Sequence, residues 1–309
     1  MGIVSVIVPV YNRDDTIERC LSMIRESKLD HELELIVVDN GSTDRSIEIA
    51  KRYADHVLFN RSRNIALARN KGAGKAQGEL LVFIDSDIYV EENTIGNLVR
   101  TLEENSMAMV GGAIYYYGGE NHGKQQKPEP ELRRITFNNR IYVEAIYGCI
   151  QATTRTVFNK VGGYDPFFSL HGEDFDLCIR YWGNGFPLIY EPTAVAWHEQ
   201  NRKIACTQEH PGRQFNLLKA IYLLPYKYEI KTRSSNSLNY IRTAFAEISQ
   251  EKLAKEVHDF LTWLITFQRF EEKVARKRYK CYLPYGYTEE LFNDTERVIE
   301  IIQRGEQVV

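Results

Sequence analysis

Strand-like and helix-like segments alternate through the first 110 residues of the chain. Apolar runs typical of buried strands and apolar residues at helical spacing follow one another at residues 4–10, 14–28, 34–39, 46–54, 56–60, 65–77, 80–85 and 91–105. Alternation of this kind predicts βαβ units and an α/β fold with a mostly parallel sheet flanked by helices. Right-handed crossovers would bring the carboxyl ends of the parallel strands to one edge, where ligands bind.

The remainder of the chain divides at about residue 210. Residues 107–119 should contain a further strand, 118–134 are polar and rich in Gly and Pro, and 148–200 show short strands and one helix near 174–182. From residue 211 the periodicity is helical, at 212–224, 238–279 and 288–304. We therefore expect an α/β domain at 1–210 and a helical C-terminal extension at 211–309.

Composition argues against several classes of protein. The net charge of -3 over 309 residues does not suit the broad basic face of a nucleic-acid-binding protein. The five cysteines are scattered without a C-x-x-C pair, so neither a disulfide framework nor a zinc site is indicated. The apolar run at 3–10 has no basic flank and is too short to span a bilayer. A reducing cytoplasm is the expected compartment.

Polar residues collect where four segments of the predicted sheet end. These segments are YN at 11–12, DNGSTD at 39–44, NIALARN at 64–70 and DSD at 85–87. These segments also have structural interpretations. The residues of DNGSTD are typical of a turn and could cap the next helix, and DSD could be a solvated turn. Four such ends at one edge of a parallel sheet nevertheless favour convergence on a single cleft.

The DSD segment carries two carboxylates one residue apart at the end of a buried strand. Such a pair suits a hard divalent cation, Mg²⁺ or Mn²⁺, which is usually held by one or two carboxylates together with substrate phosphates. The sequence contains neither G-x-x-x-x-G-K-[ST] nor G-x-G-x-x-G. A diphosphate would therefore be held here by a metal and acids rather than by a glycine-rich loop.

The order and spacing of these segments resemble the inverting nucleotide-sugar glycosyltransferases of family 2, which have the GT-A fold. The matching segments are VSVIVPVYNRDDTIERCLSMI, ELIVVDNGSTDRS, NIALARNKGAGKAQGELLVFIDSD and VGGYDPFFSLHGEDFDLCIRYWGNGFPLIYEPTAVAWHE. They cover roughly residues 3–200, and 211–309 show no comparable match. The resemblance implies transfer of a sugar from a nucleoside-diphosphate sugar to an acceptor hydroxyl, in glycan or polysaccharide synthesis.

The resemblance also implies a donor site at the matching positions. The residues expected to bind the nucleotide sugar are Pro9, Tyr11, Asn12, Asp39, Asn64, Arg69, Asp85 and Ser86. Pro9 and Tyr11 would line the base pocket, and Asp39 would accept a hydrogen bond from the pyrimidine N3–H. Because a carboxylate only accepts, it selects a base edge that donates, which uracil, thymine and guanine N1–H all provide. A UDP-sugar is the expected donor, with dTDP- and GDP-sugars left open.

The resemblance places the metal on Asp87 and Asp85, with His198 as the third ligand. Asp87 would bind the cation directly, whereas Asp85 would serve both the ribose and the metal. A capping or core histidine is the alternative for His198, and His171 is its rival. A mixed carboxylate and imidazole set suits Mn²⁺ as well as Mg²⁺. The cation would neutralise charge on the departing nucleoside diphosphate.

The segment HGEDFDLCIRYW would supply the acid-base chemistry. By resemblance Asp174 is the base that takes the proton of the acceptor hydroxyl, and Glu173 is a neighbour that could bind the acceptor. The alternative is a helix N-terminus decorated with acids that suit the helix dipole. The acceptor side would include Gly163, Tyr164, His171 and Trp182, although a core position is the competing interpretation for the tryptophan.

The C-terminal extension leaves the acceptor open between a glycan and a lipid-linked molecule. The apolar run at 260–270 is followed by several basic residues, so it could lie on the inner face of an anionic membrane. A helix packed on the catalytic domain is the plainer interpretation. Two other functions compete with transfer: a catalytically silent nucleotide-sugar-binding or scaffold protein, and a nucleotidyltransferase. The second is disfavoured because PVYNRDDTIE contains no glycine.

Overall fold

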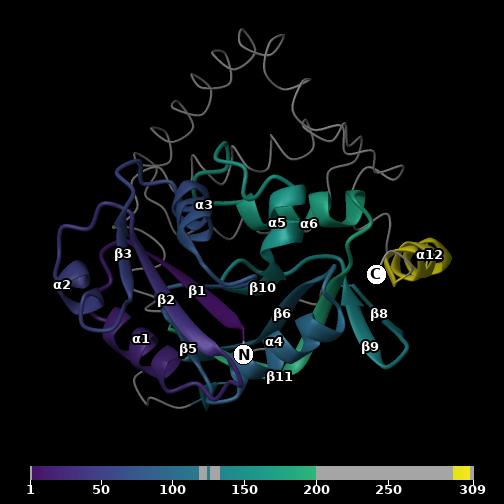
Figure 1. Cartoon of the computed structure of the whole chain (residues 1–309), viewed down its shortest axis with the longest axis horizontal. Helices are drawn as coiled ribbons and strands as arrows, with labels where there is room; N and C mark the ends of the chain where they lie inside the picture. Colours follow the sequence, from purple (N-terminus) through teal and green to yellow (C-terminus); the bar gives the residue numbers. More distant parts are fainter. Residues whose placement is uncertain (1, 118–123, 126–132, 200–294, 307–309) are drawn as a thin grey trace, which may run out of the picture.

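A computed structural model of the chain describes residues 2–117, 124–125, 133–199 and 295–306. Figure 1 shows an α/β arrangement in which a central sheet is covered by helices on both sides. The expected helices at 212–224 and 238–279, and the apolar run at 260–270, lie outside the described residues. So does most of the polar segment at 118–134.

The sheet has eleven strands, and its main path runs β3-β2-β1-β4-β10-β6-β11-β9-β8, with β5 paired to β11 and β7 to β6. In chain order the strands are β1 (Ile3–Val10), β2 (Glu32–Asp39), β3 (His56–Phe59), β4 (Leu80–Ile84), β5 (Ile88–Val90), β6 (Met109–Tyr117), β7 (Lys124–Gln125), β8 (Arg134–Phe137), β9 (Arg140–Val143), β10 (Ile150–Thr154) and β11 (Leu188–Glu199). From β3 to β11 only β10 runs against the other six strands. The expected mostly parallel sheet is therefore confirmed.

Seven helices are described: α1 (Ile17–Arg25), α2 (Ser46–Ala50), α3 (Ile65–Lys75), α4 (Thr94–Glu104), α5 (Arg155–Lys160), α6 (Glu173–Gly183) and α12 (Thr295–Glu306). In Figure 1, α3, α5 and α6 lie together on one side of the sheet, whereas α1 and α4 lie on the other. Right-handed crossovers produce this two-sided cover when the strand order reverses.

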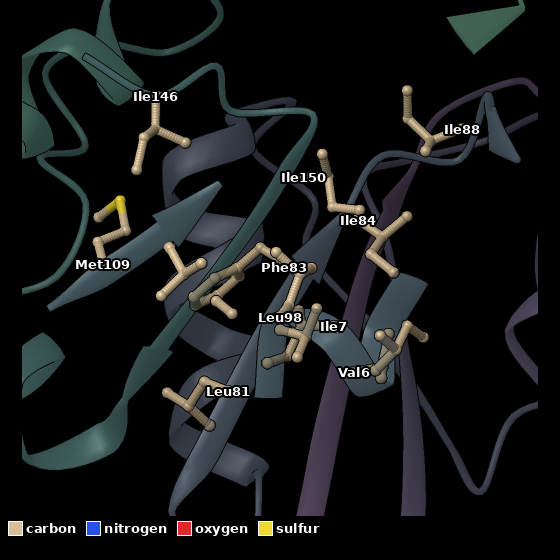
Figure 2. Close-up of a cluster of buried hydrophobic side chains, with 14 of the residues drawn as sticks. Val6, Ile7, Leu81, Phe83, Ile84, Ile88, Leu98, Met109, Ile146 and Ile150 are labelled. Atoms are coloured by element: carbon tan, nitrogen blue, oxygen red, sulfur yellow. The ribbon is translucent and has the colours of Figure 1, made fainter. Parts of the chain in front are cut away.

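The core forms between the sheet and these helices. Figure 2 shows side chains of β1 and β4, such as Ile7, Leu81 and Phe83, gathered with Leu98 of α4 and Ile150 of β10. All five are at most 1% exposed. These strands are buried on both faces, which explains why their sequences are continuous apolar runs rather than alternating patterns.

Most of the elements expected in the first 110 residues appear with shifted ends. The helix expected at 46–54 is shorter, as α2. The short helix α5 and the three-residue strand β5 were not predicted, because neither is long enough to show a clear period. Of the expected helix at 288–304, α12 confirms the part from residue 295, and its Val298 and Ile302 belong to the core. In the described part of the chain no helix has the length and apolar character needed to cross a membrane.

Candidate active site

The candidate site lies at the point where the strand order of the sheet reverses. From β1 the chain adds β2 and then β3 on one side, and returns to place β4 on the other side of β1. A crevice opens at such a switch point, outside the carboxyl ends of the strands. Tyr11 follows β1, Asp39 ends β2 and Asp85 follows β4, so the three expected donor-side segments leave the sheet at neighbouring positions.

The loops after β1 and β2 are bonded to each other. The Asn12 N–H donates to the Ser42 hydroxyl at 3.0 Å, and the Asn12 side-chain oxygen accepts from Thr43 N–H at 2.8 Å. Asn12 has a positive φ of 48°, a conformation that asparagine tolerates better than most residues. Asp39 is buried, and its Oδ1 accepts from Ser42 N–H at 2.9 Å. These contacts preorganise the rim of the crevice.

Three other donor-side residues lie in β1, in the loop after it and in the DSD turn. Pro9 is buried within β1, and the half-buried Tyr11 ring lies 5.1 Å from the Arg63 guanidinium. Ser86 is buried, and its carbonyl accepts from the Thr16 hydroxyl at 3.1 Å, which fastens the DSD turn to the start of α1. That these residues bind a nucleotide remains a prediction.

Asp87 lies between the side chains of His198 and Arg13. Its Oδ1 lies 3.6 Å from His198 Nε2, and its Oδ2 lies 3.6 Å from Arg13 Nε. Burial acts to raise the pKa of Asp87, but the hydrogen bond and charge of His198 and the charge of Arg13 outweigh it and lower this pKa. Burial acts to lower the pKa of His198, and Asp87 outweighs it and raises that pKa. Arg13 was not predicted, although it directly follows Tyr11 and Asn12 in the first loop.

The side chains expected to bind a metal lie near one another, but they are not arranged as a preformed set of three ligands. Two carboxylates and an imidazole face the same region, and this donor set suits Mn²⁺ or Mg²⁺. Over the described ranges, however, no three His, Cys, Asp or Glu side chains are arranged so that they could hold one ion. That Asp85, Asp87 and His198 bind a metal stays a prediction. Asp87 is committed to ion pairs, and Asp85 to Arg69.

Arg69 is buried and connects the two halves of the site. Its Nη2 donates to Asp85 Oδ1 at 2.7 Å and to the Gly148 carbonyl at 2.9 Å, and its Nη1 donates to Glu173 Oε1 at 2.9 Å. The residue is only 1% exposed. Its guanidinium is enclosed by protein groups, which does not favour the predicted contact of Arg69 with the nucleotide.

Asn64 is likewise engaged by protein groups, which does not favour the donor-binding role predicted for it. It is the N-cap of α3, where its Oδ1 accepts from Leu67 N–H at 3.0 Å, and its Nδ2 donates to the Pro166 carbonyl at 2.7 Å. Both ends of the buried amide are thus engaged in holding α3 and the loop before α6. Helix-capping chemistry, rather than donor binding, explains this asparagine.

The two acids at the start of α6 have different surroundings. Asp174 is half-buried, its Oδ2 accepts from Gly148 N–H at 3.0 Å and its Oδ1 accepts from Phe175 N–H at 2.9 Å. Glu173 is only 5% exposed and pairs with Arg69, which does not favour the predicted contact of Glu173 with an acceptor. Burial, and then the charge of Asp174, raise the pKa of Glu173 to about 7, against the opposing effect of Arg69.

Two of the expected acceptor-side side chains belong to the core. Trp182 is 1% exposed, and its indole N–H donates to the Val143 carbonyl at 3.2 Å. Tyr164 is fully buried, and its hydroxyl donates to Gln151 Oε1 at 2.5 Å. Neither ring can stack on a sugar from these positions. Large aromatic residues occur both at sugar-stacking positions and in protein cores. The sequence alone does not distinguish these two roles.

Gly163 and His171 mark the two ends of the loop that leads into α6. Gly163 has a positive φ of 65°, and a Cβ at this position would lie 2.8 Å from Asn70 Oδ1. Asn70 in turn bonds both the N–H and the carbonyl of Tyr164, at 2.9 and 2.7 Å. His171 is half-buried, just before Gly172, the N-cap of α6. An acceptor role for the loop itself stays a prediction.

The fold defined by this sheet and site is GT-A. Its arrangement is similar to that of the crystal structure of GalNAc-T7 with UDP, GalNAc and Mn²⁺, at a TM-score of 0.58 and 19% identity, covering 89% of this chain and 57% of that one. It is also similar to the mannosyltransferase PcManGT of Pyrobaculum calidifontis in complex with GDP-Man and Mn²⁺, at a TM-score of 0.52 and 17% identity, covering 98% and 86%.

Sequence comparison gives the family. The sequence model of the family described as Glycosyl transferase family 2 matches residues 5–162, and the chain belongs to this family. The glycosyltransferase AglE of Haloferax volcanii is 30% identical over 63% of this chain and 66% of its own length. TarP of Staphylococcus aureus, a poly(ribitol-phosphate) beta-N-acetylglucosaminyltransferase, is 23% identical over 94% of this chain and 93% of its own.

Other relatives match over shorter stretches. The uncharacterized glycosyltransferase EpsJ of Bacillus subtilis is 36% identical over 43% of this chain and 40% of its own length. The chain thus spans less than half the length of EpsJ, and the same holds for EpsH, GlyA and YfnE.

Proposed function

We propose that the chain is a metal-dependent inverting glycosyltransferase that moves a sugar from a nucleoside-diphosphate sugar, a UDP-sugar first, to an acceptor hydroxyl. The observation that carries this proposal is the position of Asp174. Its carboxylate is half-buried at the start of α6 and is tied through Gly148 and Arg69 to Asp85, at the switch point of a GT-A sheet. A base facing a donor site is what an inverting transfer requires.

The proposed reaction is a single displacement. The acceptor oxygen forms a bond to the anomeric carbon while the bond from that carbon to the diphosphate breaks, and Asp174 takes the proton of the acceptor hydroxyl. The N–H groups of Gly148 and Phe175 each bind one oxygen of this carboxylate, so its orientation is fixed before the acceptor arrives. Fixed orientation of a general base is a large part of its catalytic effect.

The donor nucleotide would bind over the loops after β1 and β2. Asp39 is buried with its Oδ1 on Ser42 N–H, and a carboxylate has acceptor capacity left for a base N–H. Pro9, Tyr11 and Asn12 would form the pocket around the base. The UDP bound to GalNAc-T7 supports a UDP-sugar, whereas the GDP-Man bound to PcManGT keeps a GDP-sugar among the donors to be tested.

Asp87 and Asp85 would hold Mn²⁺ or Mg²⁺ together with the donor diphosphate. Ions of this type are usually bound by one or two carboxylates plus substrate phosphates, so three preformed protein ligands are not required. When bound, the cation would neutralise the charge of the departing diphosphate. His198, 3.6 Å from Asp87, would either complete the set or remain an ion-pair partner of Asp87. The Mn²⁺ bound to both structural neighbours supports a divalent cation here.

The acceptor would be a glycan or a lipid-linked molecule that approaches Asp174 along the loop containing His171. TarP, similar over 94% of this chain, acts on a poly(ribitol-phosphate), which supports a polymeric acceptor in polysaccharide synthesis. Nothing in the described residues tests the peripheral membrane contact predicted for the C-terminal extension. The cytoplasmic location, at the inner face of a membrane where the acceptor is lipid-linked, remains part of this proposal.

Transfer from a panel of UDP-, dTDP- and GDP-sugars, measured as nucleoside diphosphate release with Mn²⁺ or Mg²⁺, tests the function. We expect Asp174→Asn to lower turnover about 10²- to 10⁴-fold, because an amide cannot take a proton. Asp87→Ala should remove the dependence of turnover on the cation. The exposed Asp30→Asn is the matched control, since it makes the same chemical change far from the candidate site.

Each result assigns or removes one role. Full turnover in Asp174→Asn would reject the proposed base, and cation-dependent turnover in Asp87→Ala at the wild-type level would reject the metal ligand. Nucleotide-sugar binding without transfer to any acceptor in the wild type would instead favour the catalytically silent binding protein.

A further inference from the structure

We propose that Gly148 and Arg69 form a junction that positions the proposed base Asp174 relative to the donor-side carboxylate Asp85. Neither Gly148 nor Arg69 touches the reacting atoms. This inference rests on the proposed function for its catalytic consequence, but the junction itself is a physical arrangement that can be tested without any substrate. Both would be positioning residues.

Gly148 uses both of its backbone polar groups within the site. Its N–H donates to Asp174 Oδ2 at 3.0 Å, and its carbonyl accepts from Arg69 Nη2 at 2.9 Å. The next carbonyl, that of Cys149, accepts from the backbone N–H of Asp85 at 3.0 Å. One short segment before β10 therefore contacts the backbone of Asp85, the side chain of Arg69 and the side chain of Asp174.

Only glycine fits at this position without displacing a neighbour. A Cβ on residue 148 would lie 3.2 Å from Asp174 Cβ, 3.2 Å from Arg69 Nη2 and 3.3 Å from Arg69 Nη1. Such distances are tighter than ordinary carbon contacts, so one side has to yield. Because three hydrogen-bonding partners hold Arg69, we expect a Cβ at residue 148 to shift Asp174 by a few tenths of an ångström.

Arg69 closes the connection on the donor side. The same nitrogen that reaches the Gly148 carbonyl also donates to Asp85 Oδ1 at 2.7 Å, and the guanidinium lies 5.1 Å from the Tyr164 ring centre. A planar guanidinium holds such a set of partners in one fixed geometry, which a lysine ammonium does not. Asp85 is thus bonded to the guanidinium directly, and Asp174 is connected to it through Gly148.

The network contains an incompletely bonded pair of polar atoms. Within the described residues, Arg69 Nε and Glu173 Oε2 are buried without a hydrogen-bond partner. A network selected for stability alone would satisfy these atoms, since a buried unpaired polar atom costs free energy. Retaining them beside the proposed base is what we expect of a site in which the position of the groups matters more than their number of bonds.

Amide hydrogen exchange tests the junction without substrate. In Arg69→Lys, which keeps the charge and loses the planar fork, we expect the Gly148 and Asp85 amides to exchange at least about tenfold faster, as expected of locally weakened hydrogen bonds, while amides of β1 and β2 keep their rates. Gly148→Ala should likewise speed exchange of the residue 148 amide. Unchanged exchange of these amides in both variants would overturn the inference, whether or not the chain transfers a sugar.

Turnover tests the catalytic consequence. Gly148→Ala should lower kcat by about tenfold to a hundredfold through displacement of the base, while the dissociation constant for UDP changes by less than about threefold. Gly74→Ala is the matched control, because a Cβ at that exposed position on α3 meets nothing within 4 Å. In the double variant Arg69→Lys with Gly148→Ala, the losses should be smaller than the product of the two single losses, because both act on one contact.

The outcomes separate the two proposals. A wild-type chain that transfers no sugar refutes the proposed function, and the exchange experiment still decides the junction. A wild-type chain that transfers sugar, together with a folded Gly148→Ala variant within twofold of its kcat, refutes the positioning role alone. A loss confined to UDP affinity would also contradict it, since the displacement is predicted to fall on Asp174.

Discussion

Two buried arginines in the described part of the chain have opposite surroundings. Arg180 of α6 is 0% exposed, and its Nε and Nη2 donate to Asp176 Oδ2 at 2.9 and 2.7 Å. Its Nη1 donates to the carbonyls of Val161 and Gly163 at 2.7 and 2.6 Å. Every nitrogen of that guanidinium is therefore bonded, whereas Arg69 keeps an unpartnered Nε and faces a carboxylate with an unpartnered oxygen.

The difference separates a buried charge that fixes the fold from one that organises a site. Arg180 ties α6 to the turn at Val161 and Gly163, and its partner Asp176 is equally buried. Arg69 instead joins Asp85 and Glu173, two carboxylates that are 88 positions apart in the sequence. The first network is closed, whereas the second includes the partly exposed Asp85 and connects through Gly148 to the half-buried Asp174.

The strongest test of this comparison is Arg180→Met. We expect it to lower the free energy of unfolding by about 3–5 kcal/mol, because it leaves the Asp176 carboxylate buried and unpaired. Chemical denaturation with guanidinium measures the loss. Where the variant stays folded, its kcat should remain near that of the wild type, in contrast with Arg69→Lys.

A double variant is the control for this test. Asp176→Leu combined with Arg180→Met removes both charges and should recover much of the lost stability, since apolar residues of similar volume often replace a buried ion pair without cost. If the single variant lost activity in proportion to Arg69→Lys while remaining stable, the proposed division between the two arginines would be wrong.

The second test uses the pH dependence of stability. Burial, reinforced by Asp174, raises the pKa of Glu173 from 4.5 to about 7 in the folded chain, so the folded state binds this proton more tightly than the unfolded state. The stabilisation from this group is therefore fully present below pH 4.5 and is lost as the pH rises through 7. The difference corresponds to about 3 kcal/mol.

Glu173→Gln should remove that slope. Free energies of unfolding measured in urea at pH 5 and pH 8 should differ by about 3 kcal/mol less in this variant than in the wild type. The exposed Glu32→Gln serves as the matched control and should keep the wild-type slope. An identical slope in Glu173→Gln and the wild type would mean that Arg69 holds Glu173 charged at both pH values.

The sequence predicted the parallel half of the molecule well, because strands buried on both faces form continuous apolar runs and the helices between them show a helical period. It placed Asp39, Asp85 and Asp87 at one edge of the sheet, since carboxyl ends of parallel strands must meet there. It could not show that Arg69 and Asn64 point into protein rather than toward a ligand. Polar residues at a strand end or helix start have the same sequence signal whether they bind a donor or fasten a loop.

Long-range contacts explain the remaining misses. Gly148 gave no signal in EAIYGCIQ, because its importance depends on Arg69 and Asp174, which come from distant parts of the chain. Trp182 and Tyr164 were assigned to the acceptor side by resemblance, and only the packing of α6 and the loop before it on the sheet shows that they are buried. The hydrophobic period of a helix or strand shows which of its faces is buried. It does not show which residue each side chain contacts.

The smallest expected effect concerns Asn64. Asn64→Ala removes the N-cap of α3 and the bond to Pro166, and should lower the free energy of unfolding by about 1–2 kcal/mol, as measured by urea denaturation. Because the buried amide is engaged by protein groups, the dissociation constant for UDP should stay within about twofold of the wild type. Thr154→Ala at the N-cap of α5, where the hydroxyl accepts from Val157 N–H at 3.3 Å, is the matched loss of a cap outside the candidate site.

A tenfold weaker UDP affinity in Asn64→Ala with unchanged stability would support the donor-binding role expected from the sequence. It would also mean that the N-cap of α3 takes part in donor binding.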